Sequence, residues 1–545
     1  MFLLVTMKLN TSSGLLLVLE WEISEKFFGE MGMPLVLDWV SCMFVMSVFY
    51  ISGCVSLFSG FYMSHEVFMG RFTHLMQAFV FSMVILILFP GYLGLMVGWD
   101  GLGVVSFLLV VYYMNSESLS AGMITAISNR VGDACFILVI GMMSGYLSYN
   151  YSGGEVFKVG LVSVLILVGS MTKSAQIPFS AWLPEAMAAP TPVSTLVHSS
   201  TLVTAGVYVL VRFSEYLGEL EMNVLMFISM VTMLLAASSG TLEVDMKKVV
   251  ALSTLSQVGM MMFAISLGSN EVAFFHLLVH AFFKALMFMC VGGVIFYSSG
   301  CQDGRFLGGV WLKLPITSVL LVFSNLSLMG FPFLSGFYSK ELIVGKCLCE
   351  SYSLVGFLLV LVSLGFTVCY SSRMMMLMLC DVGASALSHY KTENILYMSA
   401  LVMMSNGALS MAVLMQSYFS VFLSDCLPRG GIFYSFLVWV LFSLTNFIII
   451  LVVAPQNIIS KPLKSTLSFM WFLKPMSGNF ISSQFLNFMS YFISDVEMGW
   501  IRGYIWQSGM KNLVIGTSNK LRKMNFNMIG MIIFYCLVFV GLIFY

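Results

Sequence analysis

The sequence predicts an all-α polytopic membrane protein with roughly fifteen or sixteen transmembrane helices. Of its 545 residues, 59% are hydrophobic and only 9% are charged, whereas soluble domains carry about 25% charged residues. Apolar runs long enough to cross a bilayer recur along the chain, and most connections between them are short. A soluble globular enzyme is therefore excluded, and the net charge of zero implies no nucleic-acid partner.

The apolar runs give the expected spans in order. They lie near residues 1–19, 35–62, 72–90, 91–113, 120–147, 156–176, 190–213, 222–240, 247–267, 271–297, 314–345, 354–380, 395–416, 432–454 and 526–545. The first run lacks the small-residue cleavage site of a signal peptide, so we interpret it as a short first span. Polar residues from Lys8 to Ser13 leave open whether that span crosses the membrane fully.

Residues 455–525 are less hydrophobic than the rest of the chain. This segment holds eight basic residues with aromatic residues between them, a mixture typical of an amphipathic helix at a membrane interface or along other helices. A loop with one short helix is the alternative interpretation. The last apolar run then returns the chain to the membrane.

Two long apolar regions are interrupted by proline and glycine. In the first, Lys173 precedes the pair Pro178 and Phe179, and His198 follows further along. In the second, Lys340 follows the pair at 332–333. Non-helical backbone at membrane depth is stable only when it is buried in protein or lines a wet cavity. Interrupted segments in two halves are typical of ion sites in transporters with inverted repeats, although chance also produces such a mirrored order.

Two carboxylates, Asp100 and Asp133, lie well inside apolar runs. Asp100 lies in the segment GWDGLGVV, where its charge must be neutralised, paired or hydrated. A structural ion pair or a position at the membrane interface is the alternative to an ion-conducting role. Arg130 and Asp133 are three residues apart, so we expect them to share a helix face and to pair. Their spacing fits a structural pair as well as a conducting one.

The most specific polar pattern is a stripe of His276, His280 and Lys284. A four-residue spacing places these side chains on one face of an otherwise apolar helix. Histidine titrates near neutral pH and can relay protons, so the stripe predicts a proton relay, with hydrogen bonding between helices as the alternative. The sequence contains no Walker loop, dinucleotide fingerprint or nucleophilic triad, and its eleven cysteines show no metal-binding spacing. Proton or cation movement is the chemistry that remains.

Six segments resemble the antiporter-like membrane subunits of respiratory complex I, in the order of that family. The resemblance covers residues 35–380 and rests on GWDGLGVVSFLL, SNRVGD, TKSAQIPFSAWLPEAMAAPTPVSTLVHSSTLVTAGVYVL, DMKKVVALSTLSQVGMM, HLLVHAFFKALMFM and GFPFLSGFYSKE. It implies two inverted five-helix repeats, each with one discontinuous helix, and a lateral amphipathic helix along neighbouring subunits. The implied segments are N-terminal helices at 1–90, repeats at 91–240 and 241–416, a helix region at 417–454, the lateral helix at 455–525 and an anchor at 526–545.

The resemblance also implies roles for individual residues. Asp100 and Lys173 would form the carboxylate–lysine pair of the first half-channel, although many family members have glutamate where this chain has Asp100. Separating that pair would release the lysine proton inward toward His198. The central axis would hold His276, His280 and Lys284, the exit side would hold Lys340 with Glu341 beside it, and Asp133 would be a further acid near the first half-channel.

The implied function is proton translocation across the inner mitochondrial membrane, coupled to electron transfer from NADH to ubiquinone in other subunits. This chain would bind no cofactor, because NADH, FMN, iron–sulfur clusters and ubiquinone would belong to the parent complex. Its expected partners are the other membrane-arm subunits, above all the neighbouring antiporter-like ones, and membrane lipid. Two alternatives stay open: a subunit of a multi-subunit cation/proton antiporter, and a purely structural membrane scaffold.

Overall fold

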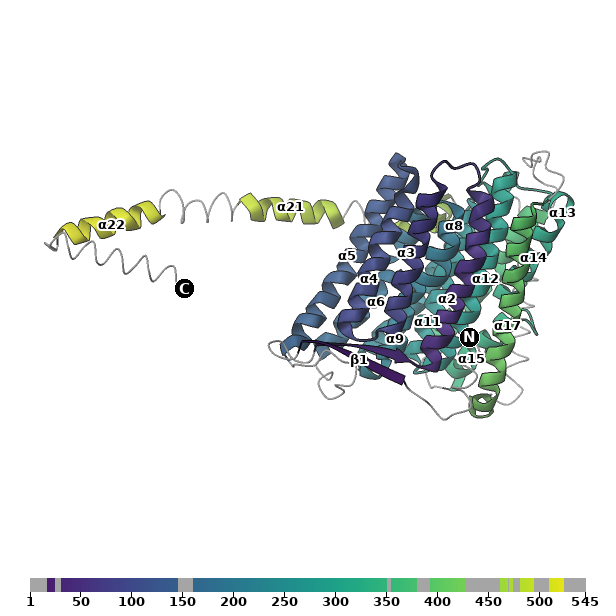
Figure 1. The fold of residues 1–545 in the computed structure, drawn as a ribbon, viewed down its shortest axis with the longest axis horizontal. Helices are drawn as coiled ribbons and strands as arrows, with labels where there is room; N and C mark the ends of the chain where they lie inside the picture. Colours follow the sequence, from purple (N-terminus) through teal and green to yellow (C-terminus); the bar gives the residue numbers. More distant parts are fainter. Residues whose placement is uncertain are drawn as a thin grey trace. The chain divides into compact units, whose positions relative to one another are not determined.

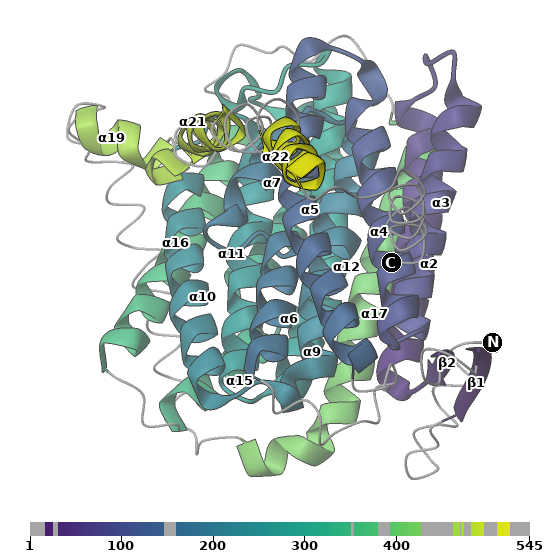
Figure 2. The same ribbon diagram turned by 90° about the vertical axis from the view of Figure 1, so that its left-hand side faces the viewer.

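The computed structural model describes residues 17–24, 31–145, 160–349, 354–379, 393–426, 461–468, 470–473, 481–494 and 509–523. The chain divides into two compact units, Met1–Lys474 and Pro475–Tyr545. The first unit contains the helical bundle in Figures 1 and 2. Every residue that the sequence singled out as a candidate for proton transfer lies in this unit.

Ten helices among the described residues are long and apolar enough to cross a membrane. They are α2 (Trp39–Tyr62), α3 (Met69–Leu88), α4 (Tyr92–Val110, extended by η1, Val111–Tyr113), α5 (Ser116–Gly145), the run α8–η5–α9 (Thr191–Val193, Ser194–Thr201 and Leu202–Phe213), α10 (Glu219–Gly240), α11 (Met246–Ser266), α12 (Asn270–Tyr297), α16 (Leu354–Leu379) and α17 (Ile395–Cys426). They are fewer than the roughly fifteen or sixteen spans predicted. The predicted spans at 432–454 and 526–545, and most of the one at 1–19, lie outside the described residues.

A β-hairpin departs from the predicted all-α fold. Strand β1 (Leu17–Ser24) pairs antiparallel with β2 (Met31–Leu37), and the hairpin lies near the foot of α2 in Figure 2. The predicted span at 35–62 therefore begins too early, because its first three residues belong to β2. Glu20 and Glu22 alternate with Leu19 and Trp21, a period of two that is typical of a strand.

The ends of two helices are tied together beside this hairpin. The N–H of Asp38 donates to the Ser41 hydroxyl over 2.8 Å at the start of α2. The Asp38 carboxylate also accepts from Arg212 at the end of α9, with 2.6 Å between Oδ2 and Nη1. Both side chains of this pair are mostly buried, so the ion pair fixes the start of α2 against the end of α9.

Two helices are broken at the predicted proline and glycine positions. The first half-helix, α6 (Gly160–Lys173), is followed by short turns: η3 (Phe179–Ala181), α7 (Trp182–Glu185) and η4 (Ala186–Ala188). The second break separates α14 (Pro315–Met329) from α15 (Ser335–Cys349). Gly330 caps α14 with a positive φ of 81°, a conformation that glycine adopts without steric cost. The short elements η6 (Ser214–Tyr216), η7 (Gly304–Phe306) and α13 (Val310–Lys313) connect longer helices.

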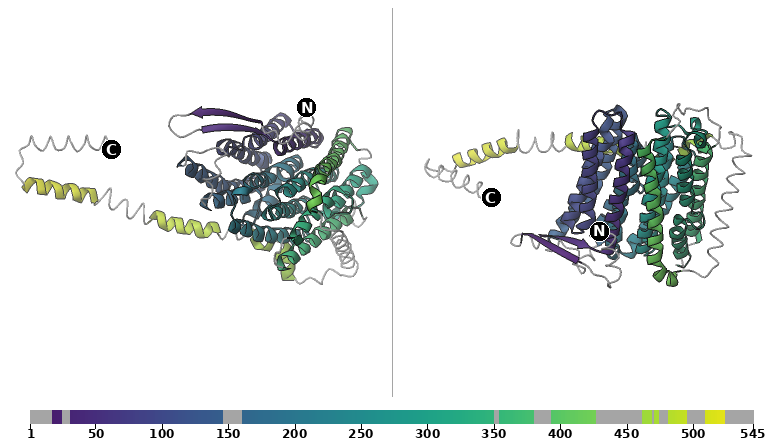
Figure 3. Two further views of the ribbon diagram at one scale, coloured as in Figure 1. Left: turned by 90° about the horizontal axis from the view of Figure 1, so that it is seen from below. Right: turned by 45° about the vertical axis from the view of Figure 1, so that its right-hand side comes forward.

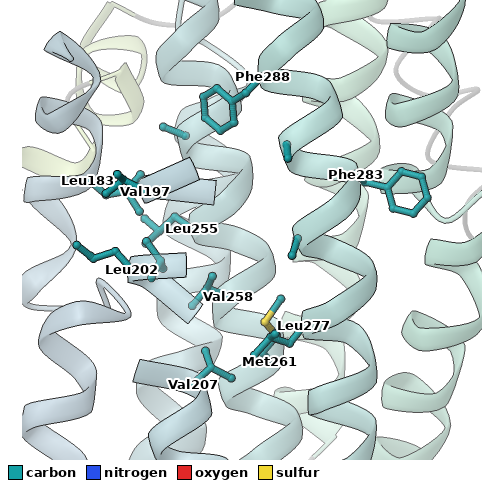
Figure 4. Close-up of a cluster of buried hydrophobic side chains, with 14 of the residues drawn as sticks. Leu183, Val197, Leu202, Val207, Leu255, Val258, Met261, Leu277, Phe283 and Phe288 are labelled. Carbon is teal, nitrogen blue, oxygen red and sulfur yellow. The ribbon is translucent and has the colours of Figure 1, made fainter. Parts of the chain in front are cut away.

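The centre of the bundle is enclosed by other helices. α11 and α12 are buried along their apolar length, and they pack against α9, α10 and α14. Figure 4 shows apolar side chains of α11, among them Leu255 and Met261, between those of η5–α9 and α12. Figure 3 shows the blue, teal and green helices of the first unit side by side. A polar or charged side chain on α12 is therefore surrounded by protein rather than by lipid.

The predicted lateral helix at 455–525 is described in part. In the first unit, α19 (Lys461–Ser468) and η8 (Met470–Phe472) pack against α10. The second unit contains α21 (Ile481–Ile493) and α22 (Gly509–Lys523). Within that unit, α21 exposes Phe485, Phe488 and Phe492 at helical spacing, as expected of a helix with one apolar face.

Candidate functional site

The first site is built around Lys173, the last residue of α6. Its side chain is fully buried, and its ammonium donates to the Trp99 carbonyl of α4 over 2.5 Å. The same Nζ atom lies 3.8 Å from the centroid of the Trp99 ring, which is a close cation–π contact. A single residue, Trp99, therefore holds the lysine through both its backbone and its side chain.

Asp133 of α5 is the buried acid of this site. The Trp99 indole Nε1–H donates to Asp133 Oδ1 over 2.9 Å. Arg130, one helical turn earlier, lies 3.1 Å from Asp133 Oδ2, which confirms the predicted pairing of these two residues. Lysine, indole, carboxylate and guanidinium thus form a continuous polar group across α6, α4 and α5.

Asp100 is placed differently from the expectation. Its side chain is 44% exposed and pairs with Arg130 over 3.4 Å. Within the described part of the chain, Asp100 makes no direct ion pair with Lys173. Successive residues of an α-helix point about 100° apart, so when Trp99 faces Lys173, Asp100 turns toward the surface of the unit. In this structure the acid connected to Lys173 through Trp99 is Asp133 rather than Asp100, and the expected role of Asp100 as the partner of Lys173 stays a prediction.

A close approach between α5 and α6 makes this arrangement possible. A Cβ atom added to Gly132 would clash with the Thr172 hydroxyl and would lie 3.1 Å from the Gly169 carbonyl. Gly132 and Thr172 directly precede Asp133 and Lys173 in the sequence. The missing side chain therefore lets the helix bearing the acid contact the helix bearing the lysine.

His198 lies in the π-helical turn η5, where it is 1% exposed. Among the described residues, neither ring nitrogen has a hydrogen-bond partner. Trp182 lies beside it, with 6.1 Å between the ring centroids, and donates its own Nε1–H to the Thr172 carbonyl over 3.0 Å. Trp182 therefore connects the end of α6 with His198. Single π-turns inside α-helices are frequent at functional sites.

The second site is the buried stripe on α12. His276 Nδ1 lies 2.8 Å from the Ser339 hydroxyl of α15, and its Nε2 lies 3.3 Å from Gln257 Oε1 of α11. The His276 and His280 rings are 6.2 Å apart, as the predicted four-residue spacing requires. The ring nitrogens of His280 have no hydrogen-bond partner among the described residues.

Lys284 completes the stripe one turn further along α12. The side chain is fully buried, and its ammonium donates to the Ser253 hydroxyl of α11. Ser253 and Gln257 are four residues apart on α11, so two successive turns of α11 present polar groups to α12. Sequence inspection did not select Ser253 or Gln257, although their shared spacing in an apolar helix is a signal that could have found them.

Lys340 lies on α15, next to Ser339. It is 1% exposed and donates to the Leu328 carbonyl in the last turn of α14. The carbonyl end of a helix attracts positive charge. Glu341 is only partly buried, and its position next along the helix directs it away from Lys340. Through Ser339 and His276, the second broken helix is thus connected to the stripe on α12.

Known proteins match this chain over most of its length. Residues 91–367 match the family model described as NADH:quinone oxidoreductase/Mrp antiporter, TM. NADH-ubiquinone oxidoreductase chain 5 of Locusta migratoria is 40% identical over 495 residues, which cover 88% of this chain and 86% of the relative. The chain belongs to the NADH-ubiquinone oxidoreductase chain 5 family. The predicted resemblance to antiporter-like membrane subunits is thereby confirmed, and the chain is a multi-pass membrane protein.

Other members of the chain 5 family align over a shorter stretch. The proteins of that name from Aedes aegypti and Anopheles gambiae are each 46% identical over 362 residues, which are 65% of this chain and 62% of each relative. The chain thus matches less than two thirds of the length of these two relatives.

Solved structures show the same fold. A chain in the Mrp complex from Dietzia sp. DQ12-45-1b gives a TM-score of 0.66 at 24% identity, covering 99% of this chain and 58% of that one. A chain in the membrane-bound sulfane sulfur reductase, an archaeal respiratory membrane complex, gives a TM-score of 0.67 at 20% identity. The match covers 82% of this chain and 92% of that chain.

Proposed function

We propose that this chain is the proton-translocating membrane-arm subunit of a respiratory NADH:ubiquinone oxidoreductase in the inner mitochondrial membrane. One observation carries the proposal: three lysines and three histidines lie inside one enclosed helical bundle. Each of Lys173, His198, His276, His280, Lys284 and Lys340 is at most 4% exposed. Ionisable groups inside membrane spans are costly and are typical of proton relays.

The partners of these lysines support transport over a purely structural role. Lys173 is held by an indole and a carbonyl, Lys284 by a hydroxyl and Lys340 by a carbonyl. Within the described residues, none of the three forms a direct ion pair with a carboxylate. A scaffold would be expected to neutralise each buried lysine permanently, whereas these partners allow the lysine to lose and regain its proton.

The order of the groups suggests a route for the proton. It would be bound at Lys173, whose charge is influenced by Asp133 through Trp99, and would pass by way of His198 to the stripe of Lys284, His280 and His276. Lys340, connected to His276 through Ser339, would release it on the exit side, with Asp100 and Glu341 at the less buried margins. Moving one charge against 100 mV requires about 2.3 kcal/mol, which electron transfer in other subunits would supply.

In this proposal the redox groups lie in other subunits. NADH, FMN, iron–sulfur clusters and ubiquinone would belong to the parent complex, and this chain would bind none of them. The described residues contain no group of three or more His, Cys, Asp or Glu side chains that could hold a metal ion. The neighbouring antiporter-like subunits and membrane lipid would be its direct partners.

The proposed architecture is a pair of inverted five-helix repeats at 91–240 and 241–416. Each repeat would contain one discontinuous helix, with Lys173 at the end of the first half-helix in one and Lys340 in the second half-helix of the other. The N-terminal helices at 1–90 and the helix region at 417–454 would flank the repeats. The lateral helix at 455–525 would lie along the neighbouring subunits, and the segment 526–545 would anchor it.

A second candidate is a subunit of a multi-subunit cation/proton antiporter. The fold shared with a chain of an Mrp complex over 99% of this sequence favours it, because the same bundle serves both kinds of assembly. Gentle solubilisation of the source membranes distinguishes the two. Migration in a very large assembly with NADH:quinone activity supports the proposal, whereas migration with a few small membrane subunits and sodium/proton exchange supports the antiporter.

A direct test uses the lysine itself. In the assembled complex reconstituted into vesicles, Lys173→Met is expected to reduce the number of protons moved per NADH oxidised. Unchanged proton translocation in a fully assembled Lys173→Met complex would contradict the proposal.

A further inference from the structure

Trp99 contacts both a basic and an acidic side chain of the first site. It is fully buried in α4, and its indole lies between the basic and the acidic group of the first site. The face of the ring contacts the Lys173 ammonium at 3.8 Å, and the N–H edge donates to Asp133 at 2.9 Å. Phe136 fixes the ring from α5 in an edge-to-face contact, with 4.6 Å between centroids.

We propose that Trp99 is a positioning residue that keeps Lys173 and Asp133 apart while linking them through one indole. This inference rests on the proposed proton-translocating function. A lysine and a carboxylate buried side by side would form a tight ion pair, because their attraction is strong where water is excluded. The indole occupies the contact position instead, so Lys173 keeps a partner for its charged form without being locked in that form.

Few charged groups surround Lys173. The charges that act on it are Asp133, Asp100 and Arg130 from α5 and α4. His198 approaches from η5 through Trp182, and the remaining residues of α6 carry no charge. Of these three charged groups only Asp133 is buried, since Asp100 and Arg130 are 44% and 57% exposed. The spacing between Lys173 and Asp133 is therefore the geometric variable that Trp99 sets.

Trp99→Phe separates the two functions of the indole. Phenylalanine keeps an aromatic face for the ammonium and removes the N–H that holds Asp133, so the carboxylate becomes free to approach Lys173. The lysine should then retain its proton to higher pH. We expect the alkaline limb of the proton-translocation profile to move upward by about one pH unit, with fewer protons moved per NADH at neutral pH.

A double substitution gives the decisive measurement. If the shift arises from Asp133, adding Asp133→Asn to Trp99→Phe should remove it and give the profile of Asp133→Asn alone. An equal upward shift in the presence and absence of Asp133→Asn would overturn the proposal. Trp182→Phe is the matched control, because it removes an indole N–H that donates to a backbone carbonyl. An Asp133-dependent shift in that control would also count against the proposal.

Two further measurements keep the outcome clear. Lys173→Met in the same preparation tests the proposed function, which fails if proton translocation is unchanged. If proton translocation is lost in Lys173→Met while Trp99→Phe causes no pH shift, only the proposed role of Trp99 fails. Should Trp99→Phe not assemble, ultraviolet resonance Raman difference spectra of wild type against Lys173→Met and Asp133→Asn replace it. One indole should lose its cation contact in the first spectrum and weaken its N–H hydrogen bond in the second; unchanged indole bands would overturn the proposal.

Discussion

Lys340 of α15 donates a hydrogen bond to the Leu328 carbonyl of α14, so one buried lysine joins the two halves of the second broken helix. The carbonyl is in the last turn of its helix, where positive charge is favoured. The same lysine is the proposed exit group for protons. Its structural and transport roles therefore have to be separated by experiment.

Lys340→Met and Lys340→Arg make that separation. Methionine removes the charged hydrogen bond and should destabilise the bundle by about 2 kcal/mol. Arginine can still donate to the Leu328 carbonyl, but it remains charged at all relevant pH values and cannot relay a proton. We expect proton translocation by the reconstituted complex to be lost in both variants and thermal stability to fall only with methionine. Full translocation with arginine would show that Lys340 has a structural role alone.

Gly132 predicts a different kind of defect, which concerns packing rather than proton transfer. In Gly132→Ala the added methyl group clashes with Thr172, and overpacking of this kind costs about 1–3 kcal/mol. We expect less assembled complex in blue-native gels and a lower melting temperature. Gly141→Ala on the same helix is the control, because a methyl group there meets no atom within 4 Å and alanine favours a helix by about 1 kcal/mol. Equal losses in both variants would contradict this account.

The two broken helices and the α12 stripe could be predicted because their signals are local. Prolines, glycines and a four-residue spacing appear directly in the sequence. The partner of Lys173 could not be predicted, because it depends on which face of α4 meets α6. Trp99 and its neighbour Asp100 point about 100° apart on α4, and the sequence does not say which of them faces the lysine. An apolar aromatic residue between a lysine and an acid also carries no polar signal of its own. The β-hairpin was missed since its alternating residues lie between two apolar runs that suggested helices.

The loop between α12 and α14 offers a prediction about pH. The Asp303 carboxylate accepts hydrogen bonds from the Arg305 guanidinium and, over 3.0 Å, from the Arg305 backbone N–H. The guanidinium first and the backbone N–H second lower the pKa of Asp303. A lowered pKa means that the stabilisation is present above the usual carboxyl pKa of about 3.9 and disappears as the pH falls through the lower value. Amide hydrogen exchange, corrected for its intrinsic pH dependence, should therefore show this loop protected down to acidic pH. In Asp303→Asn the protection should be weaker than in wild type at every pH above the lowered pKa of Asp303; unchanged protection would show that the carboxylate does not order the loop.

Ser339→Ala tests the connection between the central stripe and the exit lysine. The hydroxyl of Ser339 contacts His276 Nδ1 at 2.8 Å, so its loss removes the link from α12 to α15 while Gln257 still faces the other ring nitrogen. A lost hydrogen bond of about 1 kcal/mol corresponds to roughly a five-fold slower proton transfer. Ser324→Ala is the matched control, because the described contact of that buried hydroxyl is to the Leu321 carbonyl of its own helix. Proton translocation should fall in Ser339→Ala and stay near the wild-type rate in Ser324→Ala. If both variants pump at the wild-type rate, the proton reaches Lys340 by a path that does not include the hydroxyl of Ser339.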